Sequence, residues 1–254
     1  MSDTVWNFRG RRFAVIGASS GVGRQTTLDL TAAGAEVLAI ARNQERLNEL
    51  TEQSPLITAA TLDVMKADSA DWAEVFGAYV REHGKLHGGV YTAGVVGLTP
   101  LRGFDENLAR NIMETSFWGA VYAIQGLSKR SVSLPEASFV LFSSLAWKSA
   151  SKGLFAYAAA KAALVAAVKS FAHELAHERK RINTISPGFM ATEMTRASID
   201  EIGSSVHAEK YTLFGLGKAQ DVTGMTLFLL SGRAKWITGE DLVVDGGYQC
   251  GVWE

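Results

Sequence analysis

The chain has 254 residues, of which 47% are hydrophobic, and its 25 basic side chains nearly balance 26 acidic ones. Such a chain can bury a substantial core, and its near-zero net charge offers no basic surface for nucleic acid. A single cysteine excludes an internal disulfide and a cysteine-built metal site, and the five histidines show no metal-binding spacing. The N-terminus lacks the apolar region of a signal peptide, and no segment has about 18 uninterrupted apolar residues. We therefore expect a cytoplasmic protein that binds neither a membrane nor a metal ion.

Short apolar segments alternate with helix-like segments along the whole chain. The expected strands are 12–18, 36–41, 57–64, 88–94, 138–144, 181–187 and 241–247. The expected helices are 22–33, 43–53, 68–83, 105–130, 155–179 and 220–231. This alternation predicts a doubly wound α/β fold of Rossmann type, with a mostly parallel seven-stranded sheet and helices on both faces. No repeat, linker or break in composition divides the chain, so we predict a single domain over residues 1–254.

The first expected strand leads into the glycine-rich turn GASSGVG, residues 17–23. Gly17, Gly21 and Gly23 permit a tight turn and a close backbone approach to a pyrophosphate, with the next helix N-terminus facing the anion. This pattern between a strand and a helix predicts a dinucleotide-binding site, and an ordinary strand-to-helix turn is the alternative.

The second expected strand ends at Ala41 and Arg42, where dinucleotide folds often have an acidic residue for the adenosine ribose. A guanidinium instead suits a 2′-phosphate through charge and bidentate hydrogen bonding. We therefore predict that NADP(H) is preferred over NAD(H), and Arg24 could support the same phosphate. The alternative is a solvated arginine at the start of the helix 43–53.

The alanine-rich helix expected over 155–179 carries a phenol, Tyr157, and an ammonium, Lys161, four positions later. Four positions are about one helical turn, so both side chains leave the same face of the helix. A nearby ammonium favours the phenolate and lowers the pKa of a tyrosine, which could then exchange a proton with a carbonyl or alcohol oxygen. A solvated pair on a helix surface is the alternative.

The motifs GASSGVG, LDV, TAG, FSS, YAAAK, SPGFMAT and DGG occur in this order along the chain. Together they resemble the short-chain dehydrogenase/reductase family, in its single-domain branch, from about Arg11 to Tyr248. The resemblance implies a Rossmann-type fold, a nicotinamide cofactor and a small-molecule carbonyl or alcohol substrate. It also implies a homotetramer or, failing that, a dimer.

The resemblance assigns roles by position. Tyr157 would be the general acid/base, Lys161 would lower its pKa and hold the nicotinamide ribose, and Ser144 would hydrogen-bond the substrate oxygen. Ser143 replaces Ser144 in this role if the register differs by one residue. The other cofactor-binding residues implied are Gly17, Ser19, Ser20, Gly21, Val22, Gly23, Arg42, Asp63, Val64, Ala93, Gly94, Pro187, Gly188 and Thr192.

Three positions depart from the family pattern. Ile16 replaces a threonine before the first glycine, and Thr92 replaces an asparagine that helps to tie the sheet together. Ser116 stands where the family has an asparagine that holds a water in a proton relay through the lysine. Since serine has a shorter side chain with fewer donors, we expect Ser116 to hold such a water less firmly.

Two segments are expected to border the substrate, the loop after residue 144 and a lid over 190–215. Their candidates for an apolar pocket are Trp147, Phe189, Met190, Met194 and Phe214, each of which could instead pack in the core or an interface. A polar or anionic substrate is the alternative to an apolar one, because the same segments carry the cations Lys148, Lys152 and Arg196.

The combination predicts an NADPH-dependent oxidoreductase that interconverts a ketone and a secondary alcohol. One alternative is an NAD-dependent alcohol dehydrogenase of the same family. A second is a noncatalytic dinucleotide-binding scaffold, which the departures at Thr92 and Ser116 suggest and the presence of Ser144, Tyr157 and Lys161 opposes.

Overall fold

A seven-stranded sheet organises the chain, of which the structure, a computed structural model, describes residues 6–149, 151–191 and 212–250. The strands lie in the order β3-β2-β1-β4-β5-β6-β7, and every neighbouring pair is parallel. The doubly wound fold predicted from the sequence is confirmed, with a sheet that is parallel throughout its described strands. Their bounds are β1 Arg12–Ile16, β2 Glu36–Ala41, β3 Ile57–Thr61, β4 Leu86–Tyr91, β5 Ser133–Phe142, β6 Arg181–Pro187 and β7 Asp241–Val244.

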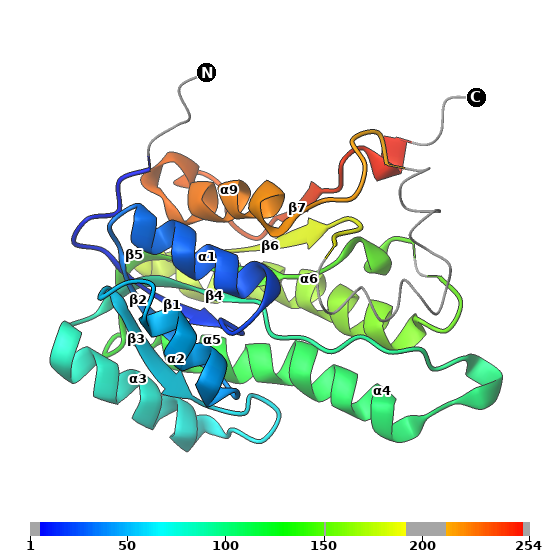
Figure 1. Ribbon diagram of the computed structural model, residues 1–254, viewed down its shortest axis with the longest axis horizontal. Coiled ribbons are helices and arrows are strands. Elements are labelled where there is room, and N and C mark those ends of the chain that lie inside the picture. The colour runs from blue at the N-terminus through cyan, green and yellow to red at the C-terminus, as the bar shows by residue number, and fades with distance from the viewer. Residues whose placement is uncertain (1–5, 150, 192–211, 251–254) are drawn as a thin grey trace.

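Helices cover both faces of the sheet (Figure 1). The helices α1 (Gly21–Ala32), α2 (Gln44–Thr51) and α9 (Ala219–Leu230) share one core cluster with the sheet. The helices α3 (Ser69–His83), α5 (Gly119–Ser128) and α6 (Phe155–Leu175) share the other. Strand β1 shows why: Phe13 and Val15 point into the first cluster, whereas Ala14 and Ile16 point into the second. Both faces are buried, which explains the near-continuous apolar strands.

Strand β5 begins earlier than its apolar pattern predicts, at Ser133 rather than residue 138. Its pairing register with β4 shifts between Leu86 and Gly88, and Glu136 has a left-handed φ of 64°. An irregularity of this kind lets the chain pair on both sides of a bulge. The apolar pattern does not reveal this early start, because the one residue that pairs with β4 before the shift is the polar Ser133.

The long helix expected over 105–130 is divided into three parts. Helix α4 (Glu106–Met113) is followed by a π-helical turn, Glu114–Trp118, and then by α5. The Tyr91 hydroxyl, at the end of β4, donates to the Thr115 carbonyl at 2.5 Å, which holds the backbone of this turn toward the sheet. Such single π-turns are frequent at functional sites, and this one contains Ser116.

Helix α6 lies between the sheet and α4. With the following turn, Phe155–Glu178 is long and apolar enough to cross a membrane by length and composition alone. Its Ala160, Leu164 and Val168 are fully buried in the core, and Ala156 and Ala160 contact the α4 side. Packing against the sheet and α4 therefore accounts for these residues, and 39% of the apolar window as a whole is buried.

Candidate active site

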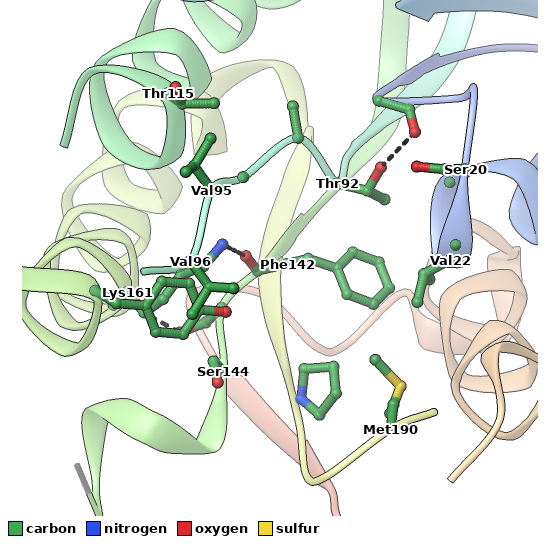
Figure 2. Close-up of a pocket in the computed structure, with 18 of the residues that line it drawn as sticks. Ser20, Val22, Thr92, Val95, Val96, Thr115, Phe142, Ser144, Lys161 and Met190 are labelled. Carbon is green, nitrogen blue, oxygen red and sulfur yellow. Dashed lines mark hydrogen bonds between the residues drawn. The ribbon is translucent and has the colours of Figure 1, made fainter. Parts of the chain in front are cut away.

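A cavity of about 370 Å³ opens at the carboxyl ends of β1, β4, β5 and β6, where the strand order reverses between β1 and β4. Ligands of open α/β sheets bind at this position. Figure 2 shows that the side chains around it come from both halves of the sheet. The predicted site residues that line it are Gly17, Ser19, Ser20, Gly21, Val22, Gly23, Arg42, Asp63, Val64, Ala93, Gly94, Ser144, Tyr157, Lys161, Pro187 and Gly188. Ser116 lies behind its wall, and Thr192 lies outside the described residues.

The glycine loop forms one end of the cavity. Gly17 and Gly21 have φ values of 86° and 51°, which side-chain-bearing residues rarely adopt. A Cβ on Gly23 would lie 2.2 Å from the Gly17 carbonyl oxygen, so α1 meets the turn too closely for any side chain. The first turn of α1 has no acidic residue, and no side chain caps it. This end of the cavity is therefore suited to an anion.

Thr92, directly after β4, hydrogen-bonds the end of β1 where the glycine loop begins. Its hydroxyl donates to the Ile16 carbonyl at 2.8 Å, and its N–H donates to the same oxygen at 2.9 Å. The hydroxyl also lies 3.3 Å from the Gly17 carbonyl oxygen, and Figure 2 shows this second bond running from Thr92 to the loop beside Ser20. A threonine at this position thus ties β4 to β1 directly, although the family pattern has an asparagine there.

Arg42 lies exposed at the rim of the cavity, next to the buried and small Ala41. Its side chain makes no hydrogen bond or ion pair with any residue that the structure describes. The adjacent Asn43 caps α2 by accepting the Arg46 N–H at 2.9 Å, so helix capping does not need Arg42. The guanidinium is therefore available to an anionic ligand. Arg24 is not among the residues that line the cavity.

Lys161 is buried in the opposite wall, with 4% of its surface exposed. Its Nζ donates to the Phe142 carbonyl at 2.8 Å, as Figure 2 shows, and lies 5.6 Å from the centre of the Tyr157 ring. Burial lowers the pKa of Lys161 to about 8. The ammonium is thus held close to the phenol by the end of β5.

The two serines that follow β5 have different partners. The Ser143 hydroxyl is buried and donates to the Lys161 backbone carbonyl at 3.0 Å. Both serines line the cavity, but the Ser144 side chain hydrogen-bonds Tyr157, whereas the Ser143 hydroxyl is engaged by Lys161. The geometry therefore favours Ser144 over Ser143 as the serine that faces a substrate.

The predicted lowering of the Tyr157 pKa is wrong for this structure. Burial in the cavity wall raises the pKa of the phenol, and the hydrogen bond with Ser144 only partly opposes this effect. Lys161 directs its Nζ at the Phe142 carbonyl, so its charge does not overcome the desolvation of the ring. The sequence located the pair correctly on one helix face but not the balance of forces on the phenol.

Ser116 is fully buried in the π-helical turn, and its Oγ has no hydrogen-bond partner among the described residues. A Cβ built on Gly94 would lie 3.5 Å from this oxygen and 3.4 Å from Lys161 Nζ. Ser116 and Lys161 therefore border the same small space beside Gly94. An unpaired buried hydroxyl next to an ammonium is a suitable place for a water molecule.

The other end of the cavity has mainly apolar walls. Its lining residues there include Val95, Val96, Leu145, Ala146, Ser149, Ser151, Leu154, Phe189 and Met190. The sequence indicated Phe189 and Met190 but missed Val95, Val96 and Leu154. Val95 and Val96 directly follow the TAG motif, so their position in the sequence could have identified them as cavity residues. Nothing in the apolar pattern distinguishes Leu154 from a core residue.

Several substrate-side predictions are not met. Trp147 faces away from the cavity and donates from Nε1 to Ser186 Oγ and Asp241 Oδ2, each at 3.2 Å. Phe214 is 87% exposed and does not line the cavity, and neither do Lys148 and Lys152. Met194, Arg196 and most of the expected lid lie outside the described residues. Within the described ranges, no group of three or more metal-ligating side chains is found.

Known proteins similar to this chain are reductases and dehydrogenases. A family model described as enoyl-(acyl carrier protein) reductase matches residues 17–249. The chain is 31% identical to the D-erythrulose reductase of Gallus gallus, over 95% of this chain and 97% of that protein. It is 29% identical to the 3-oxoacyl-(acyl-carrier-protein) reductase FabG of Escherichia coli, over 95% and 98%. A short-chain type dehydrogenase/reductase structure from Mycobacterium ulcerans superposes with a TM-score of 0.87 at 28% identity, covering 96% of this chain and 92% of that one.

Proposed function

The chain belongs to the short-chain dehydrogenase/reductase family, and on that premise we propose that it interconverts a ketone and a secondary alcohol with NADP(H), using Tyr157 as general acid/base. Family membership makes the chain an oxidoreductase. The cofactor preference and the role of Tyr157 are inferred from the site. The observation that carries them is the single cavity shared by the glycine loop, Ser144, Tyr157 and Lys161.

The residues at the loop end fit a nicotinamide dinucleotide. The loop 17–23 would hold the pyrophosphate at the start of α1, where no acidic side chain opposes an anion. Asp63 and Val64 would contact the adenine, and the nicotinamide end would meet Ala93, Gly94, Pro187 and Gly188, with Thr192 as a further contact. When bound, the cofactor supplies or accepts the hydride.

The preference for NADP(H) rests on Arg42. The guanidinium is exposed at the rim, unpaired within the described part of the chain, and next to a small residue. A 2′-phosphate could accept two charge-assisted hydrogen bonds from it, whereas a ribose hydroxyl could not. NADPH should therefore bind more tightly than NADH.

Tyr157 donates its phenolic proton to the carbonyl oxygen in reduction and takes a proton from the hydroxyl in oxidation. Ser144 would hold the same oxygen, and its hydrogen bond with Tyr157 partly offsets the rise that burial causes in the pKa of the phenol. Because the pKa of Lys161 is about 8, this residue stays mainly protonated at neutral pH. Its ammonium can then stabilise a phenolate and hold the nicotinamide ribose.

Ser116 would connect Lys161 and Tyr157 to solvent. A water in the space beside Gly94 could accept from Lys161 Nζ and bond to the unpaired Ser116 hydroxyl. The proton that Tyr157 gives up could then be replaced through this water. On this proposal, Ser116 still holds the relay water, though less firmly than an asparagine would. Proton delivery is then weakened and not lost, which favours an active enzyme over a scaffold.

The assembly we propose is a cytoplasmic homotetramer or, failing that, a dimer, with closed symmetry. Large apolar side chains are exposed on the helices that would meet: Trp118 by 44% and Tyr122 by 38% before and in α5, and Phe155 by 41% at the start of α6. Light scattering at micromolar concentration tests this, and a monomer would refute it.

The activity is tested by following nicotinamide absorbance with NADPH and NADH over a panel of ketones and alcohols. The panel includes a short ketose and a 3-oxoacyl thioester, because relatives are named for such substrates. Turnover with NADPH supports the proposal, and turnover only with NAD(H) would select the NAD-dependent alternative. Tight NADPH binding without any turnover would favour the scaffold.

A further inference from the structure

Ser144 and Trp147 belong to one short structural unit. Ser144 is the N-cap of the 3-10 turn Leu145–Trp147, and its Oγ accepts the Ala146 N–H at 3.2 Å. The Trp147 N–H donates back to the Ser144 carbonyl, also at 3.2 Å. Any movement of Trp147 is therefore transmitted to Ser144.

The indole of Trp147 ties this turn to the sheet. Its Nε1 donates to Ser186 and to Asp241 Oδ2, each at 3.2 Å. Ser186 and Thr184 each donate to Asp241 Oδ1 at 2.7 Å. Both donors are fully buried in β6, and Thr184 pairs with Asp241 across β6 and β7. The carboxylate thus accepts from two strand residues and from the turn, through charge-assisted bonds on a rigid support.

We propose that Trp147 and Asp241 are positioning residues that hold Ser144 at the substrate oxygen by tying its turn to β6 and β7. The assignment rests on the proposed function, because it takes Ser144 as the group that faces the substrate. The turn is also anchored by Leu145, which is 4% exposed, whereas Lys148 and Ser149 after it are exposed, so the bonds of Trp147 are the polar link from the turn to β6 and β7. A displacement of about 1 Å at such a position can cost up to 100-fold in rate.

The first test is Trp147→Phe, which keeps an aromatic ring and removes the indole N–H together with the smaller ring of the indole. We expect turnover in ketone reduction to fall roughly tenfold or more, with the Kd of NADPH within about twofold of wild type. Trp236→Phe is the matched control, because that tryptophan is 96% exposed. It should leave both quantities unchanged.

The pH profile separates positioning from simple stabilisation. Loss of the Ser144 hydrogen bond raises the pKa of Tyr157 further, so the rise of alcohol oxidation with pH should move to higher pH in Trp147→Phe. Lys161 is the charged group beside the phenol, and Arg42 and Asp63 lie at the cofactor end of the described lining. None of these is altered, so the shift reports on Ser144.

Asp241→Asn gives a second and independent variant. Its Oδ1 can still accept from Thr184 and Ser186, but an amide NH₂ would then oppose the indole N–H. We expect turnover to fall by no more than in Trp147→Phe, because the indole can still donate to Ser186. The double variant should be no worse than Trp147→Phe alone, because that variant already removes the donor on which Asp241 acts.

If Trp147→Phe had the turnover and pH profile of the wild type, Trp147 would not position Ser144. Losses that add up in the double variant would also overturn the proposal, because Trp147 and Asp241 would then act independently. A lower Tm and lower turnover with an unmoved pH profile would also overturn it, because Trp147 would then only stabilise the fold. A wild-type protein that reduces no ketone would instead overturn the proposed function, and this role with it.

Discussion

The two ends of the cavity are built from different parts of the chain. The cofactor end is mainly backbone: two glycines with left-handed φ, a third that excludes any Cβ, and the start of α1. The catalytic end is made of side chains from the segment after β5 and from α6. A backbone site tolerates changes in neighbouring side chains but not an added methyl group, whereas a side-chain site depends on the exact orientation of each group. Substitutions at the two ends should therefore fail in different ways.

Removal of one oxygen at the catalytic end gives the largest expected effect. Tyr157→Phe keeps the ring and removes the transferable proton, so turnover should fall at least about 100-fold. The affinity for NADPH should barely change, because the glycine loop is intact. Steady-state kinetics measure turnover, and a fluorescence titration measures the affinity for NADPH. Tyr122→Phe on α5 is the control, and a Tyr157→Phe enzyme that retained most of its activity would exclude the acid/base assignment.

At the cofactor end, one side chain is expected to matter for binding alone. Arg42→Ala should weaken NADPH binding by about 1–3 kcal/mol, the range for hydrogen bonds to charged groups. NADH, which lacks the 2′-phosphate, should bind both proteins equally and serves as an internal control. Calorimetric titration of both cofactors gives the comparison, supported by Arg102→Ala at another exposed site. Equal affinity of the wild type for NADPH and NADH would contradict it.

The buried lysine should reduce the stability of the catalytic end at neutral pH. The pKa of Lys161 is about 8 in the folded chain against 10.5 in a model peptide, so the unfolded chain binds more protons across this interval. The contribution to the free energy of unfolding therefore rises with pH from about 8 to 10.5. Lys161→Met should raise that free energy at pH 7 by about 1–2 kcal/mol, less than the full shift because the Phe142 carbonyl loses its donor.

This stability gain should shrink as the pH increases through that interval. Denaturant unfolding of the cofactor-free proteins at neutral and alkaline pH measures it. Lys169→Met, at an exposed position of the same helix, should show no comparable pH dependence. A Lys161→Met protein less stable than wild type at pH 7 would show that burial of the ammonium costs little.

Ser116 should give the smallest effect. Ser116→Asn restores the family residue, so turnover should rise by about twofold, roughly 0.4 kcal/mol, or the solvent deuterium isotope effect should shrink. The affinity for NADPH should stay constant, because the change lies behind the cavity wall. Ser116→Ala, which removes the unpaired hydroxyl, should act in the opposite direction. If Ser116→Asn changes neither turnover nor the isotope effect, Ser116 has no part in proton delivery.

The backbone-built end could be predicted almost completely from the sequence. Glycine spacing, the strand before it and the helix after it are neighbours in the chain, so local rules place Gly17, Gly21 and Gly23 correctly. Right-handed crossovers also restrict the possible strand orders to a few, although the sequence alone does not select one of them. Residues at the carboxyl ends of strands then converge without further information.

The side-chain-built end could be predicted only in part. The spacing of Tyr157 and Lys161 follows from helix geometry, but the pKa of the phenol depends on burial among residues distant in sequence. Trp147 looked like a pocket wall because it is large and follows β5, yet its N–H needs an acceptor and finds one on β7. The π-helical turn likewise depends on a hydrogen bond from Tyr91, which no periodicity reveals.

The crossed hydrogen bonds between β5 and α6 have a consequence for how this protein could acquire new substrates. Ser143 holds the backbone of Lys161, and Lys161 in turn holds the carbonyl of Phe142. Lys161 is thus fastened to the sheet by bonds in which the loop that carries Val95 and Val96 takes no part. Tyr157, by contrast, packs in one cluster with Val95 and lies in the first turn of the helix that Leu154 caps. A library that diversifies Val96 should therefore alter specificity with less effect on proton transfer than one that diversifies Val95 or Leu154.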